Sequence, residues 1–80
     1  MSIKEAVADR IRELCKQRGI VPNALANEAG VTPSTVYSLL DLSRKDVGIT
    51  TIKRLCDGLD ISVADFFDTD VFRHLEQTIK

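Results

Sequence analysis

Side chains that enzymes and metal sites depend on are scarce in this sequence. Its 80 residues include one histidine, two cysteines and four glycines. A single histidine leaves no Ser-His-Asp array, and no glycine-rich phosphate loop is present. The carboxylates gather toward the C-terminal end rather than around a second motif. We therefore expect a protein that is not an enzyme.

Metal ligands are also too few. Cys15, Cys56 and His74 together fall one ligand short of a closed four-ligand zinc site. Both cysteines occupy apolar positions of their helical patterns, so we expect two buried thiols in a reducing cytosol. No metal, cofactor or small-molecule ligand is expected.

Long apolar runs are missing as well. No stretch approaches the roughly 20 residues that span a bilayer, and the N-terminus lacks the apolar core of a signal peptide. We expect a cytoplasmic protein with no membrane partner. With 44% hydrophobic and 29% charged residues, the chain has the composition of one ordinary globular domain.

The central stretch from Pro22 to Leu40 carries the clearest pattern. Two short helical segments flank Gly30, which can adopt a positive φ and turn the chain sharply. Pro22 and Pro33 suit the first helical positions, and Thr32 is a good N-cap. The expected inward side chains are Leu25, Ala26, Ala29, Val36, Leu39 and Leu40. The outward ones on the second segment are Thr32, Ser34, Thr35, Tyr37 and Ser38. This is the outline of a helix-turn-helix.

Three further helices are predicted around it. Ser2 and Glu5 have capping-box spacing before a helix that ends at Gly19. A second helix, from about Ile49, is expected to stop near Gly58. Its expected buried residues are Ile49, Ile52, Leu55, Cys56 and Leu59. A short helix begins at Ser62, with Phe66 and Phe67 toward the core. Residues 1–68 form the predicted domain.

The sequence does not select one structure for the C-terminal extension, residues 69–80. Val71, Phe72, Leu75 and Ile79 follow one face of a potential sixth helix. Such a helix can cover the core or form a dimer contact, and a frayed tail is the third alternative. The sequence leaves these three open.

The net charge of −1 hides an uneven distribution. Residues 1–19 carry five basic and three acidic side chains, and 41–56 carry four and two. Residues 20–40 carry one acidic side chain, and 57–80 carry two basic and six acidic ones. Because salt screens charges beyond about 8 Å, an acidic end does not prevent another face from binding phosphate. Solvated helix faces with a chance bias are the alternative explanation.

Three runs carry a family resemblance over about Val7 to Phe67. They are IRELCKQRG, NALANEAGVTPSTVYSLL and ITTIKRLCDGLDISVADFF. The sequence resembles the lambda-repressor-like, Cro/C1-type helix-turn-helix domains. The resemblance implies an all-α, compact five-helix bundle whose third helix enters the major groove of double-stranded DNA, commonly as a homodimer. It implies a sequence-specific transcriptional regulator, with a repressor expected.

The resemblance also assigns residues to roles. The base-reading positions fall on Thr32, Pro33, Ser34, Tyr37 and Ser38. The phosphate-contacting positions fall on Pro22, Asn23, Thr35, Ser43, Arg44 and Lys45. Family members often have glutamine where this chain has Pro22, and proline offers no side-chain donor to a phosphate.

A second class of function stays open, namely a protein-interaction or dimerisation module of the same fold, such as an adaptor or antitoxin-like partner. Its third helix would no longer contact DNA. The arrangement of Arg44, Lys45 and Lys53 relative to Ser34 and Ser38 discriminates between the two, because a DNA-binding face needs cations beside its reading helix.

Overall fold

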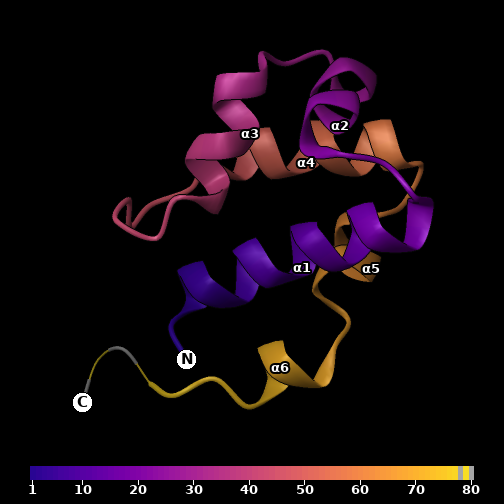
Figure 1. Cartoon of the computed structure of the whole chain (residues 1–80). Coiled ribbons are helices and arrows are strands. Elements are labelled where there is room, and N and C mark those ends of the chain that lie inside the picture. Colours follow the sequence, from indigo (N-terminus) through magenta and orange to yellow (C-terminus); the bar gives the residue numbers. More distant parts are fainter. Residues whose placement is uncertain (78, 80) are drawn as a thin grey trace.

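The computed structural model describes residues 1–77 and 79, and these residues form helices and no strands (Figure 1). The helices are α1 (Ile3–Arg18), α2 (Pro22–Ala29), α3 (Pro33–Leu40), α4 (Ile49–Leu59), α5 (Val63–Phe67) and α6 (Asp70–Arg73). The predicted all-α bundle with a sixth helix is confirmed. In Figure 1, α2 and α3 lie on one side of the long α1, and α6 lies on the other.

Local signals fix the ends of α1 as predicted. The Glu5 N–H donates to Ser2 Oγ, and the Ser2 N–H donates to Glu5 Oε1, both at 3.1 Å. The hydrogen bond from the Ser2 backbone holds the pKa of the Glu5 carboxyl below its ordinary value. Gly19 ends the helix in the left-handed region at φ 64°. A side chain with a Cβ would be strained there.

The helix-turn-helix also forms as predicted. Gly30 ends α2 at φ 69° and lets the chain reverse into α3. Thr32 is the N-cap of α3, and its Oγ1 accepts the Thr35 N–H at 3.4 Å. Pro22 and Pro33 begin their helices, where a missing N–H costs no intrahelical bond.

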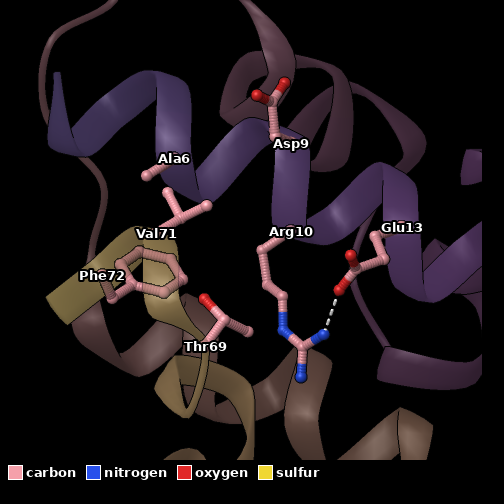
Figure 2. A pocket seen from close by; sticks show the side chains of 7 residues that line it. All are labelled: Ala6, Asp9, Arg10, Glu13, Thr69, Val71 and Phe72. Carbon is pink, nitrogen blue, oxygen red and sulfur yellow. Dashed lines mark hydrogen bonds and ion pairs between the residues drawn. The ribbon is translucent and has the colours of Figure 1, made fainter. Parts of the chain in front are cut away.

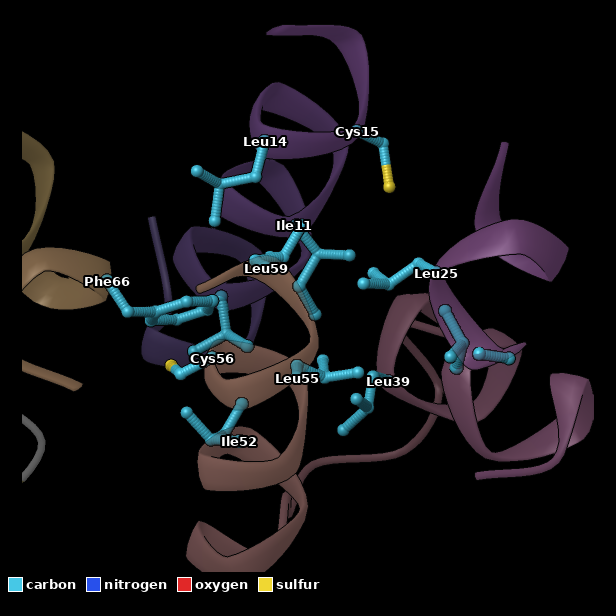
Figure 3. Close-up of a cluster of buried hydrophobic side chains, with 13 residues drawn as sticks. Ile11, Leu14, Cys15, Leu25, Leu39, Ile52, Leu55, Cys56, Leu59 and Phe66 are labelled. Carbon is cyan, nitrogen blue, oxygen red and sulfur yellow. The ribbon is translucent and has the colours of Figure 1, made fainter. Parts of the chain in front are cut away.

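Figure 3 shows the buried core, to which α1 to α5 all contribute. Its members are Val7, Ile11, Leu14, Cys15, Leu25, Ala26, Val36, Leu39, Ile52, Leu55, Cys56, Leu59 and Phe66. Burial raises the pKa of both the Cys15 and the Cys56 thiol, so both stay protonated at neutral pH. The prediction of two buried thiols is confirmed.

One prediction about α4 is wrong. Ile49 is 66% exposed, because it occupies the first helical position, one turn outside the core that begins at Ile52. The helix stops near Gly58 as predicted, with Leu59 as its last residue and Asp60 as its C-cap at φ 56°. Gly58 also has a packing role. A Cβ there would lie 2.8 Å from the backbone nitrogen of Ala29, so glycine lets α4 approach α2 closely.

The four apolar residues of the C-terminal extension do not share one face of a single helix. The helix α6 is one turn long, Val71 is 46% exposed and Ile79 is 87% exposed. Phe72 alone reaches an aromatic cluster, with its ring centroid 5.0 Å from that of Phe67 and 6.4 Å from that of Phe66. One anchored side chain does not hold a longer helix, since isolated helices shorter than about 12–15 residues are marginal in water. Residues 78 and 80 lie outside the described residues.

Arg10 of α1 holds the end of α5. Its Nε donates to the Phe66 carbonyl at 2.7 Å, and a terminal nitrogen donates to the Asp65 carbonyl at 2.9 Å. Figure 2 shows its ion pair with Glu13. Beside it, α1 and α6 enclose a pocket of about 60 Å³, which has room for water rather than for an organic ligand.

Two more cations of α1 act in the same way. Lys4 Nζ donates to the Ser38 carbonyl at 3.0 Å, near the end of α3, and Arg18 donates to the Leu59 carbonyl at the end of α4. Positive groups are favourable at helix C-termini, where carbonyls lack intrahelical donors. Three of the cations counted for residues 1–19 therefore bind other helices. Among the described residues, no helix has the length and apolar character that crossing a membrane requires.

The close approach of α4 to α2 yields a stability prediction. Alanine is normally favoured over glycine inside a helix by about 1 kcal/mol. We expect Gly58→Ala to destabilise the protein by about 1–3 kcal/mol instead, because the new Cβ would meet the Ala29 backbone, which cannot rotate away. Denaturant unfolding measures the change. Thr50→Ala, at an exposed site on the same helix, is the control and should stay within about 0.5 kcal/mol. A stabilised Gly58→Ala variant would contradict the prediction.

Candidate nucleic-acid interface

The outward face of α3 is accessible. Thr32, Pro33 and Ser34 are exposed at its start, and Tyr37 is 50% exposed one turn later. Ser38 is half-buried. Val36 and Leu39 are buried on the opposite side of the helix and anchor it to the core. The five predicted base-reading residues thus lie at the start and along the outer side of one anchored helix.

Hydroxyl groups at the start of α3 bond to one another. Thr32 Oγ1 lies 3.0 Å from Ser34 Oγ and 2.9 Å from Thr35 Oγ1. Thr35 is half-buried. Since each hydroxyl can both donate and accept, the cluster fixes the rotamers and can still offer hydrogen bonds outward. The cluster is therefore a preorganised polar surface of small side chains.

The start of α2 presents the other predicted contact residues of the helix-turn-helix. Asn23 is exposed, and Pro22 is half-buried at the first helical position. The N-cap is Val21, which is 63% exposed and has no side-chain acceptor for the first N–H groups of the helix.

The loop after α3 is organised by Asp41. Its Oδ1 accepts the Ser43 N–H at 3.0 Å and the Ser43 hydroxyl at 2.8 Å. These bonds hold the pKa of the Asp41 carboxyl below its ordinary value, and Arg44 and Lys4 add smaller effects of the same sign. Arg44 Nε lies 3.7 Å from Asp41 Oδ2, with the arginine side chain 66% exposed. The structure thus brings Ser43 and Arg44 together in one ordered turn.

Lys45 and Lys53 have other neighbours. Lys45 and Asp46 line a groove together with the N-terminal end of α1 and residues 75–77. Lys53 is exposed on α4 and pairs with Asp57 one turn further along. Arg44 is therefore the cation that follows α3 most directly, whereas Lys45 faces the N-terminal end of α1.

Sequence reasoning missed Lys4 and Asp41. Lys4 is 3% exposed, and Asp41 ends α3 and orders the following turn. A signal for Lys4 was present, because it lies three residues before Val7 and seven before Ile11, the spacing of one buried face of α1. Across the described residues, no group of three or more His, Cys, Asp or Glu side chains could hold a metal ion.

Comparisons with known proteins show the family to which this fold belongs. The family model of the Cro/C1-type HTH DNA-binding domain matches residues 10–70. The chain is 33% identical over 64 residues to the SPbeta prophage-derived uncharacterized HTH-type transcriptional regulator YopS of Bacillus subtilis (strain 168), covering 80% of this chain and 86% of that protein.

A solved structure is similar over nearly the whole chain. The crystal structure of the prophage Lp1 protein 11 superposes with a TM-score of 0.82 at 36% identity, covering 94% of this chain and 100% of that one. The matched family is one of DNA-binding regulators and is not typically enzymatic. The chain therefore belongs to the Cro/C1-type helix-turn-helix family and is a DNA-binding domain of the transcriptional-regulator type.

Proposed function

We propose that the protein is a sequence-specific transcriptional repressor that inserts α3 into the major groove of double-stranded DNA. The observation that carries the proposal is the outer side of α3, where Ser34 and Tyr37 are exposed while Val36 and Leu39 anchor the helix in the core. A rigid helix with small polar side chains at its start can approach base edges closely.

Each base-reading residue has a chemical role in this proposal. The hydroxyls of Ser34 and Ser38 bond to base edges, and the Tyr37 ring and the Thr32 methyl group touch thymine methyl groups. Pro33 fixes the backbone at the start of the helix. Because serine and threonine both donate and accept, they discriminate less sharply than bidentate side chains. Several such contacts must therefore act together.

Phosphate contacts orient the domain on the duplex. They come from the start of α2, from the start of α3 and from the loop after α3. The residues are Pro22, Asn23, Thr35, Ser43, Arg44 and Lys45. The α2 and α3 segments carry one charged side chain, Glu28, so the positive charge of this surface comes mainly from the loop. Phosphate contacts set the salt dependence of binding without reading the sequence.

Repression by a homodimer fits this surface. A single module of this size covers a small area of DNA, roughly 600–1,000 Å² of its own surface. Two copies on half-sites about 34 Å apart double the specific contacts. Occupying a promoter in this way blocks transcription without further chemistry.

Fluorescence anisotropy against the DNA that flanks its own gene tests the proposal. We expect the flanking DNA to bind at least about 10³-fold more tightly than a scrambled duplex of equal length. Equal affinities at the same salt concentration would contradict sequence-specific binding and would favour the interaction-module alternative.

A negative charge placed on α3 should weaken DNA binding. Ser34 is exposed at the second position of α3, where a glutamate favours the helix but would face phosphates. We expect Ser34→Glu to weaken DNA binding by more than about tenfold, since each specific contact contributes roughly 1–3 kcal/mol. Anisotropy measures the affinity, and circular dichroism should show an unchanged melting temperature.

Ala64→Glu is the matched control for Ser34→Glu. Ala64 is exposed at the second position of α5, so the variant adds the same charge at an equivalent helical site. Full affinity in Ala64→Glu is expected. If Ser34→Glu also keeps full affinity, α3 is not the reading element.

The loop cations should set part of the salt dependence. We expect the double change of Arg44 and Lys45 to alanine to weaken binding to every DNA sequence alike. The slope of log K against log salt should flatten by up to about 1.8, or about 0.9 per lost phosphate contact. The single variants separate the two residues, which matters because Lys45 lines the groove beside α1. Arg73→Ala, which removes a cation paired with Asp68 and Asp70, is the control. A slope equal to that of the wild type would refute the assignment.

A further inference from the structure

A lysine is buried where α1 meets the end of α3. Lys4 is 3% exposed, and its Nζ donates to the Ser38 carbonyl at 3.0 Å. The same carbonyl accepts the Asp41 N–H at 3.3 Å. The two donors match the two lone pairs of that oxygen, so the last turn of α3 is tied both to its own C-cap and to α1.

The bond from Lys4 reaches the same turn that holds the loop. Asp41 ends α3, and its carboxylate orders Ser43 and Arg44. The Arg44 N–H also donates to the Asp41 carbonyl at 3.1 Å. One continuous set of contacts therefore runs from the Lys4 ammonium through the end of α3 to two of the proposed phosphate-contacting residues.

The apolar packing of α3 comes from residues other than Lys4. Burying an ammonium costs desolvation energy, and an apolar side chain of similar length is often equally or more stabilising in such a place. Val36 and Leu39 already bury the inner side of α3. The ammonium adds a directional hydrogen bond to one carbonyl. This bond fixes the position of α3 relative to α1 more narrowly than an apolar contact does.

We propose that Lys4 is a positioning residue of the DNA-binding surface, which fixes the end of α3 and the 41–44 turn relative to α1. The inference rests on the proposed function of α3. The role of Lys4 differs from that of a phosphate-contacting residue, because a buried ammonium bonded to a carbonyl does not release counterions from DNA.

Lys4→Met tests this role, because methionine keeps most of the apolar stem and lacks the ammonium. We expect operator affinity to fall roughly 2- to 30-fold, the range typical of residues that act through a coupled contact. The slope of log K against log salt should stay within about 0.3 of the wild-type value, since no phosphate contact is lost. Without DNA, the NMR amide signals of residues 38–44 should shift, and those of α5 should stay in place.

Lys16→Met is the matched control, since it removes the same charge from an exposed site on α1. It should leave the affinity and the amide signals of residues 38–44 unchanged. Lys4→Arg, which keeps a cationic donor, should recover part of the lost affinity.

Three results would overturn the proposal. Unchanged affinity in Lys4→Met would show that α3 needs no such tie. A slope flattened by about 0.9 would make Lys4 a phosphate contact. Loss of folding in Lys4→Met would make its role one of general stability. Failure of the proposed function would be recognised separately. In that case the wild-type protein itself would bind the flanking DNA no more tightly than a scrambled duplex.

Discussion

The structure depends on hydrogen bonds that side chains of α1 donate to the C-terminal ends of other helices. Lys4, Arg10 and Arg18 donate to carbonyls at or near the ends of α3, α5 and α4. These carbonyls lie in the last helical turns, where backbone donors from a following turn run out, and a cation there also meets the negative end of the helix dipole. One long helix thereby holds the C-terminal ends of three others in place. The apolar core supplies most of the stabilising energy, and these hydrogen bonds orient the helices relative to α1.

The candidate interface depends on this arrangement because its own helices are short. The helices α2 and α3 have eight residues each, too few to be stable alone in water. Packing against α1 and α4 holds them, and Gly58 permits the closest of these approaches. On the helix held in this way, Thr32 Oγ1 and Ser34 Oγ lie 3.0 Å apart. The position of the surface thus depends on residues that do not belong to it.

Charge counting by segment was a partial guide to this surface. It separated an acidic C-terminal end from the rest of the chain. It also counted Lys4, Arg10 and Arg18 among the available cations, although all three bind backbone carbonyls. A lysine that shares one helical face with Val7 and Ile11 marks such a case, since a charge at a buried position needs a partner inside the protein. The assigned contact residues themselves stay predictions.

The sequence by itself determined where most helices begin and end and that the chain contains a helix-turn-helix. These features depend on bonds within about four residues, such as the Ser2–Glu5 capping box and the turn at Gly30. Only the tertiary structure decided that Ile49 is exposed, that α6 is one turn long and that Gly58 packs against the Ala29 backbone. It alone paired Lys4 with Ser38, 34 residues away, and Arg10 with Phe66, 56 residues away. Burial and distant hydrogen bonds depend on which helices meet in space, and a local pattern carries no information about that.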